Sequence, residues 1–249
     1  ATDFEYCEDL VKKAEFEAWL LGKGMGPHQN AYYALYALHT ELTYAWIKAE
    51  SRDPQQKRLL FWKMSVGQIF DGKVEASPIH RALYHVVQNY DIERFHMRRM
   101  IDTRLNHVGV PQLQDIKALG QYIDGVYSSL LYLLLQVSGV KDHQADHAAS
   151  HVGKALGVVH LLRFTPLMLQ RRQSLFPADV CAKEGLSEED MYRYSGEEPH
   201  EAFQKVVFAV ASEAMSQIKH MRTIPDVPKA AHPVLLHSVI CETYLKRLQ

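Results

Sequence analysis

The sequence predicts an all-α protein that folds as a single domain over residues 1–249. Apolar residues recur with helical spacing over 28–50, 111–138 and 200–222. No stretch shows convincing strand-like alternation, and helix caps and breakers punctuate the chain instead of Gly-rich linkers. With 249 residues, 47% of them hydrophobic, the chain can bury one large core.

The expected helices of the N-terminal half start at capping residues or prolines and stop at Gly, Asp or Pro. Side chains of Ser, Thr, Asp and Asn accept hydrogen bonds from the free N–H groups of a first turn, and proline also fits that turn. The predicted ranges are Thr2 or Asp3 to Gly22, about Asn30 to Glu50, Gln55 to about Phe70, Pro78 to about Gln88, and Asp91 to about Asn106.

The C-terminal half is predicted in the same way. Pro111 is expected to open a long helix that ends at Gly139, and the next helix is expected to run from Lys141 to Phe164. Pro166 should halt that helix, because proline has no N–H group and clashes with the preceding turn. The remaining expected elements are a short helix ending at Gly185, a helix start at Ser187, an acidic loop over 188–198, and helices over 200–222 and 229–248.

Composition and charge argue against several kinds of protein. The net charge of -1 and the pI of about 7.0 give no basic surface for nucleic acid. The three cysteines lie far apart, without the spacing of a zinc motif or a disulfide framework, which fits a reducing compartment. The longest apolar run, 128–137, is shorter than the ~20 residues of a membrane span, so we expect peripheral membrane contact at most. The start at Ala1 fits removal of a targeting peptide or a sequence cut at this point.

No carboxylate occurs between Asp146 and Asp179, and within this stretch Leu162-Arg163 is followed by Phe176-Pro177. This frame resembles the second signature helix of the squalene/phytoene synthase family, in which Leu-Arg precedes Asp-x-x-x-Asp. The two Asp positions fall here on Phe164 and Met168. A magnesium-diphosphate site needs hard oxygen ligands, which neither a phenyl ring nor a thioether supplies.

The first acidic motif of the family is absent as well. Residues 34–38, Ala-Leu-Tyr-Ala-Leu, resemble the segment that precedes Asp-Asp-x-x-Asp in active members, and those Asp positions fall here on Thr43, Tyr44 and Ile47. The nearby Glu41 projects from another helix face. The resemblance therefore implies an isoprenoid-synthase-like helical bundle that is a pseudoenzyme with no catalytic residue and no cofactor, since ionisation of a prenyl diphosphate loses its electrostatic driver.

A narrower resemblance concerns 128–133, 139–142, 145–155 and 162–166. These segments are similar to the branch of the family that assists assembly of mitochondrial NADH:ubiquinone oxidoreductase, complex I. The resemblance implies a mitochondrial protein on the matrix side of the inner membrane. Its expected partners are complex I subunits or assembly intermediates, which it would join as a transient factor or as a permanent accessory subunit.

A basic stretch leaves a ligand hypothesis open. Arginine can hold a phosphate directly by forked hydrogen bonds, without magnesium. A cavity lined from 31–47 and 130–160 could then receive an anionic lipid or a quinone. Alternatively, the basic side chains face a protein partner or solvent. A further alternative is that bulky side chains plug the cavity. An active prenyltransferase is the least favoured alternative. The basic residues are Lys154, His160, Arg163, Arg171 and Arg172.

Three histidines, His143, His147 and His151, recur at i, i+4 and i+8. A helix rises about 12 Å over eight residues, so one ion cannot contact all three. A neighbouring pair with outside ligands could bind zinc. The preferred interpretation is a polar seam of hydrogen-bonded histidines, and no metal site is predicted.

Overall fold

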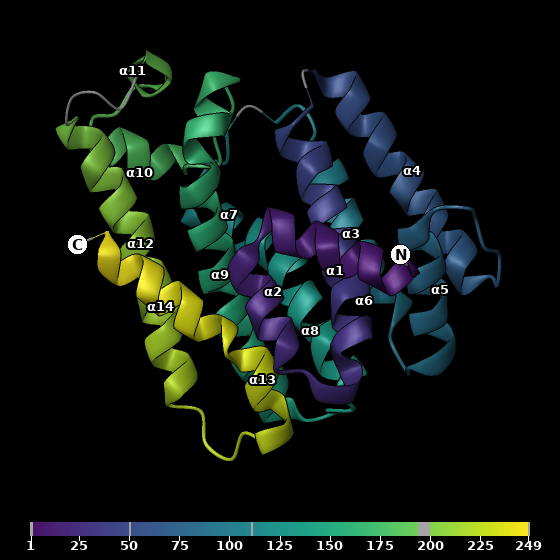
Figure 1. Cartoon of the computed structure of the whole chain (residues 1–249). Coiled ribbons are helices and arrows are strands. Elements are labelled where there is room, and N and C mark those ends of the chain that lie inside the picture. Colours follow the sequence, from purple (N-terminus) through teal and green to yellow (C-terminus); the bar gives the residue numbers. More distant parts are fainter. Residues whose placement is uncertain (1, 50, 111, 194–199, 249) are drawn as a thin grey trace.

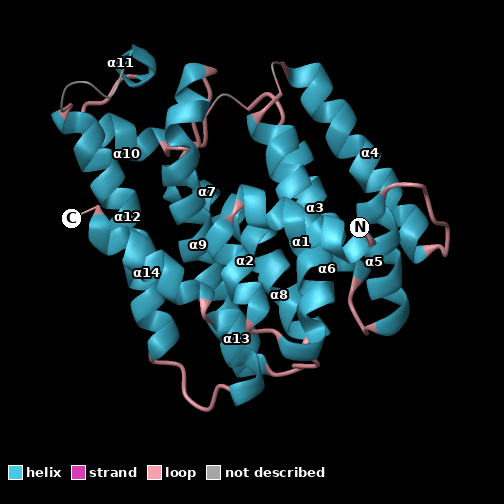
Figure 2. Ribbon diagram, viewed as in Figure 1, coloured by secondary structure: helices cyan, strands magenta, loops and turns pink. Residues whose placement is uncertain are grey.

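The computed structural model describes residues 2–49, 51–110, 112–193 and 200–248. Within these ranges the regular structure is helical and no strand occurs (Figure 2). The all-α prediction is therefore confirmed. Buried residues from the first helix to the last join one hydrophobic cluster.

The N-terminal half follows the predicted helices with two differences. Its elements are α1 (Asp3–Ala14), α2 (Phe16–Lys23), a 3₁₀ turn (Gly26–His28), α3 (Gln29–Ile47), α4 (Arg52–Phe70), α5 (Pro78–Asn89) and α6 (Arg94–Leu105). Thr2 caps α1 in a capping box with Glu5, as expected. The predicted first helix is interrupted at Glu15, and Glu93 rather than Asp91 precedes α6.

In the C-terminal half, the two predicted helices over 111–139 and 229–248 are each divided into shorter elements. Its elements are α7 (Ile116–Ile123), a π-helical turn (Asp124–Ser128), α8 (Ser129–Val137), α9 (His143–Gln170), α10 (Ala178–Lys183), α11 (Glu188–Arg193), α12 (Glu201–Arg222), a 3₁₀ turn (Lys229–Ala231), α13 (His232–Leu235) and α14 (His237–Arg247). Asp115 caps α7, so the helix starts later than expected. Pro111 and residues 194–199 of the predicted acidic loop lie outside the described residues; 188–193 of that loop are helical.

Helix α9 continues through Pro166, so the predicted stop at this residue is wrong. The proline removes one backbone donor, but tertiary packing offsets this loss because Met168 and Leu169 beyond it are buried. Thr165 also satisfies the carbonyl of Leu161 with its hydroxyl, at 2.7 Å. The extra turn carries Met168 into the interior.

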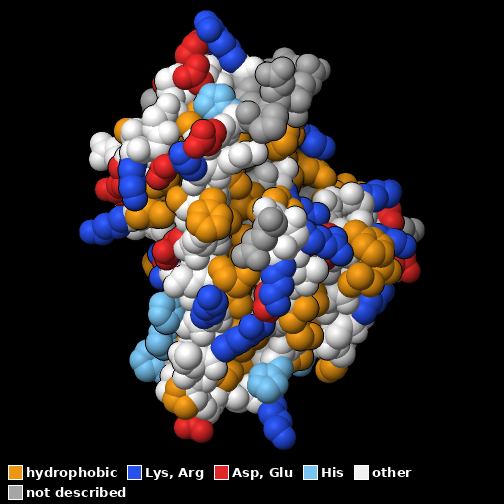
Figure 3. Space-filling model, turned by 90° about the vertical axis from the view of Figure 1, so that its left-hand side faces the viewer, with side chains coloured by type: hydrophobic (Ala, Val, Ile, Leu, Met, Phe, Trp, Pro, Cys, Tyr) orange, Lys and Arg blue, Asp and Glu red, His pale blue; other side chains and the backbone are white. Residues whose placement is uncertain are grey.

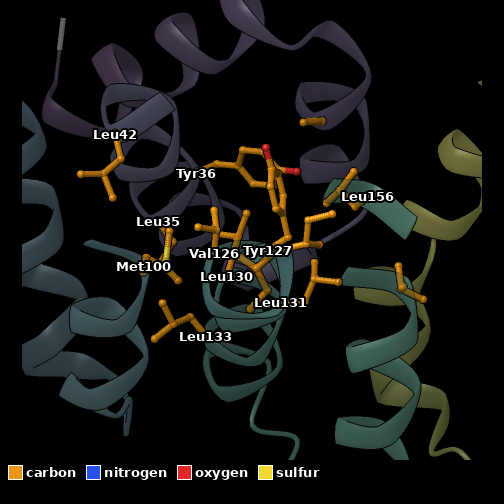
Figure 4. Close-up of a cluster of buried hydrophobic side chains, with 14 of the residues drawn as sticks. Leu35, Tyr36, Leu42, Met100, Val126, Tyr127, Leu130, Leu131, Leu133 and Leu156 are labelled. Atoms are coloured by element: carbon orange, nitrogen blue, oxygen red, sulfur yellow. The ribbon is translucent and has the colours of Figure 1, made fainter. Parts of the chain in front are cut away.

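Helices α3, α8 and α9 form the centre of the molecule. Helix α1 packs on α3 and α5, α4 packs on α6, and α12 and α14 cover α9 from the other side (Figure 1). Figure 4 shows Leu35 of α3, Met100 of α6 and Leu130 of α8 meeting between these helices, next to Val126 of the π-helical turn. The central helices therefore position the side chains at the ends of α3 and α9.

One helix among the described residues, α9, is long and apolar enough by these two criteria to cross a membrane. In its most apolar window, 67% of the residues are buried inside the protein. Core helices of water-soluble proteins have the same properties, so this helix is weak evidence for a span.

Glycines allow α9 to cross the π-helical turn closely. A Cβ atom added at Gly153 would lie 2.7 Å from the Cα atom of Ser128 and 2.8 Å from its nitrogen. A Cβ atom at Gly157 would lie 2.2 Å from a methyl carbon of Ile123. Side chains at these positions would therefore push the two segments apart.

We expect Gly153→Ala to lower the free energy of unfolding by about 1–3 kcal/mol, because the methyl group overpacks a backbone contact. Gly120→Ala in α7 is the matched control, since a Cβ atom there meets nothing within 4 Å. The control should be neutral or stabilising by up to about 1 kcal/mol, because alanine favours a helix. Urea unfolding of both variants measures the difference, and equal effects would contradict the packing argument.

Candidate functional site at the ends of α3 and α9

Four of the five degenerate motif positions meet in the interior. Thr43 and Ile47 from α3 and Phe164 and Met168 from α9 border the same cavity. The fifth position, Tyr44, lies outside this cavity, with the Nζ atom of Lys48 at 3.6 Å from its ring centre. The fold thus brings together the two helix segments whose sequences resemble the segments with the acidic motifs of the family.

This cavity has a volume of about 30 Å³. Such a space holds about one or two water molecules, whereas small-molecule pockets usually measure ~300–1,000 Å³. Trp46, Tyr122 and Phe164 are among the bulky side chains around it. An acyl or prenyl chain does not fit this cavity, because bulky side chains occupy the space beside the motif positions.

The charged side chain at this cavity is a cation. Arg104 of α6 lines it, is only 2% exposed, and donates hydrogen bonds to the Thr43 hydroxyl and the Met100 carbonyl oxygen, both at 3.1 Å. Burial lowers the pKa of its guanidinium group from the usual value. No carboxylate belongs to the described lining. A guanidinium at this position repels a magnesium ion, which is the opposite of what the acidic motifs would provide.

A second polar group of residues lies next to this cavity. Glu15 projects from the junction of α1 and α2, His39 from α3, and His160 from α9. The Oε2 atom of Glu15 lies 3.1 Å from Nε2 of His160, and Oε1 lies 3.8 Å from Nε2 of His39. The pKa of Glu15 is lowered to about 2 although burial opposes this shift, because the two histidines and Arg163 favour the charged carboxylate. His160 borders the cavity as well.

Comparison with known proteins assigns the fold to a family. Residues 25–249 match the family model described as squalene/phytoene synthase. This chain belongs to that family. Two solved structures share its fold: a dehydrosqualene synthase in complex with ligand (TM-score 0.82, 19% identity, 99% of this chain and 84% of that one) and the squalene synthase HpnC from Alicyclobacillus acidocaldarius (0.80, 16%, 98% and 92%).

Relatives closer in sequence carry a different description. The proteins named "NADH dehydrogenase (ubiquinone) complex I, assembly factor 6" are 35% identical in Rattus norvegicus and 32% in Homo sapiens, over 98% of this chain and 73% of each relative. The homolog from Dictyostelium discoideum is 30% identical over 87% of this chain and 61% of its own length. The family resemblance in the sequence is therefore confirmed.

The basic residues do not gather at one anion site in this squalene/phytoene synthase family member. Arg163 pairs with Glu17 at 3.2 Å, and Arg172 pairs with Glu189 at 3.1 Å. The guanidinium of Arg171 donates to the carbonyl oxygens of Ile47 and Ala49 at the end of α3, where a cation complements the helix dipole. Lys154 borders a separate hollow beside α7 and α12.

Two of the three histidines at the start of α9, His147 and His151, belong to a polar seam with Gln217. The Nε2 atoms of His147 and His151 lie 3.2 Å apart, and Nδ1 of His151 lies 2.7 Å from the side-chain oxygen of Gln217. The group of three potential metal ligands found among the described residues does not include them.

A larger hollow of about 730 Å³ lies on the outside, along α12 and α14. Phe208 on its wall is 67% exposed, and Met215 and Leu248 are further apolar members. Figure 3 shows hydrophobic side chains spread between charged ones on this side of the molecule. Any chain-like ligand of this family member would have more room here than in the interior.

Sequence reasoning missed Glu15, His39 and Arg104. The sequence predicts a continuous helix across Glu15, and nothing near this residue indicates that its carboxylate turns inward. The burial of His39 could have been predicted, since this histidine directly follows the apolar residues 31–38 of a helix that is buried on most sides. The burial of Arg104 could not, because α6 contains four arginines and the sequence does not distinguish the buried one.

Proposed function

We propose that this chain is a catalytically inactive member of the squalene/phytoene synthase family that acts in the assembly of mitochondrial complex I, or as an accessory subunit of it. The observation that carries the proposal is the match over 98% of the chain to relatives named complex I assembly factor 6. The proposed location is the matrix side of the inner membrane, with peripheral attachment. The proposed partners are complex I subunits or assembly intermediates.

The interior supports the inactive part of the proposal. Thr43, Ile47, Phe164 and Met168 stand at motif positions and leave about 30 Å³ between them and their neighbours. Arg104 adds a positive charge where an active relative needs magnesium ligands. A prenyltransferase reaction would therefore lack both the ion and the space for its substrate.

A lipid- or quinone-binding function is the remaining alternative. The small volume of the cavity at the motif positions disfavours it, and the outer hollow along α12 and α14 offers more room for such a ligand. Native mass spectrometry of the protein purified without detergent separates the two functions. A bound lipid or quinone would favour the alternative, whereas a ligand-free mass supports a protein that acts by binding partners.

Blue-native electrophoresis of mitochondria from the source organism tests the assembly role. We expect the endogenous protein to migrate with complex I or with its assembly intermediates, as identified by mass spectrometry. Depletion should lower the amount of assembled complex I and leave citrate synthase activity unchanged. Normal complex I after complete loss, in cells without a paralogue, would contradict the proposal.

A further inference from the structure

The α1–α2 junction and the helices α3 and α9 bring a carboxylate and two imidazoles together. Glu15, His39 and His160 each offer one ligand atom, and these atoms lie within 4.8 Å of one another. Ligand atoms held about 2.1 Å from a tetrahedral ion lie roughly 3.4 Å apart. The separations of 3.1 Å and 3.8 Å between the carboxylate oxygens and the two Nε2 atoms lie on either side of this value.

Hydrogen bonding within the group leaves polar atoms without partners. His39 is 0% exposed, and neither of its ring nitrogens has a hydrogen-bond partner. Only His160 lies close enough to donate to Glu15, at 3.1 Å. A buried polar atom without a partner costs free energy, and few such atoms occur in folded proteins. The imidazole of His39 therefore lies near the carboxylate, but no hydrogen bond offsets the cost of burying its ring nitrogens.

The surroundings hold both rings in place. The ring of Tyr127 contacts His39 at 5.2 Å and His160 at 5.1 Å between ring centres, with its plane steeply inclined to both. Tyr127 belongs to the π-helical turn, and Gly157 permits its approach, since a Cβ atom there would lie 2.8 Å from the Tyr127 ring. π-Helical turns often occur at functional sites.

We propose that Glu15, His39 and His160 bind one borderline divalent transition-metal ion, of the class of Zn²⁺ or Fe²⁺. Two imidazoles and one carboxylate are a ligand set that these ions take, with a further position open to water. Magnesium prefers oxygen ligands and is not expected there. None of the three residues stands at a degenerate Asp position of the family motifs.

A bound ion would also supply a partner for the buried His39 imidazole, whose two ring nitrogens make no hydrogen bond. The bound ion would join the α1–α2 junction to α3 and α9, so it would act as a staple across the core.

A zinc titration of the whole 249-residue chain tests the proposal. The protein carries His147→Ala and His151→Ala to remove the surface pair, is stripped with EDTA under denaturing conditions, and is refolded with Zn²⁺ or without metal. We expect one equivalent of Zn²⁺ per chain against a chromophoric chelator and a melting temperature several degrees higher than without metal. Mg²⁺ should leave the melting temperature unchanged. Anaerobic Fe²⁺ in place of Zn²⁺ shows which ion binds more tightly.

Ligand variants identify the site. Glu15→Gln and His39→Asn should each weaken Zn²⁺ binding by roughly 100-fold or more, whereas His237→Gln, at another buried histidine, should retain it. Refolding with Co²⁺ supplies a readout that needs no ligand variant, because Co²⁺ in a tetrahedral site with imidazole ligands absorbs visible light strongly. Absence of both zinc binding and a cobalt spectrum in the refolded protein would overturn the proposal. Unchanged affinity in the two ligand variants would do the same.

Discussion

Purified protein is expected to release no diphosphate from farnesyl or geranylgeranyl diphosphate in the presence of Mg²⁺. Enzymes accelerate their reactions by at least about 10⁶-fold, so an active site and a silent one differ by many orders of magnitude. Two causes predict silence here. The cavity between Thr43, Phe164 and Met168 has a volume of about 30 Å³, and the charged group on its lining is the Arg104 guanidinium.

The matched comparison is the chain with Phe164→Asp and Met168→Asp, which restores the two carboxylates of the second motif. This variant should stay silent, since the first cluster is still missing and the added carboxylates face Arg104 without space for a substrate. A dehydrosqualene synthase serves as the active control. Diphosphate release by the unmodified chain above a no-enzyme sample would refute the pseudoenzyme proposal.

The helices could be predicted from local sequence wherever their ends are set by local chemistry. Thr2 with Glu5 forms the expected capping box, and α12 occupies 201–222, close to the predicted 200–222. Pro166 shows the limit of this reasoning, because packing of the following turn outweighs the lost hydrogen bond. The break at Glu15 is similar, because the Glu15 carboxylate contacts His160 of α9, which local sequence does not indicate.

The site could be predicted in part. The motif positions Thr43, Ile47, Phe164 and Met168 were identified from the order of short family-like segments, and the structure brings them to one cavity. The closed state of that cavity depends on side chains from α6, α7 and α9 together, which no single segment encodes. The arginines after Leu162 formed a cluster in sequence only; their partners Glu17 and Glu189 belong to other helices.

Acid should destabilise the protein through His237. This fully buried histidine accepts a hydrogen bond from the Tyr36 hydroxyl at 3.0 Å, and its Nδ1–H donates to the Val234 carbonyl at 2.7 Å. Burial lowers its pKa to about 4, with a smaller contribution from His160, while Val234 and Glu15 oppose the shift. The unfolded chain, with a histidine pKa of about 6.5, therefore binds a proton between pH 6.5 and 4 that the folded chain does not.

This difference gives a stability that is fully present above pH 6.5 and declines as the pH falls towards 4. The contribution of His237 to the loss is about 3 kcal/mol between pH 7 and pH 4, calculated at about 1.4 kcal/mol per pKa unit. His237→Gln should remove it, so the free energy of unfolding of this variant should depend less steeply on pH than that of the unmodified chain. His85→Gln, at an exposed histidine, is the matched control. Urea unfolding at half-unit pH intervals measures the three slopes, and a His237→Gln slope equal to that of the unmodified chain would show that this buried histidine is not the titrating group.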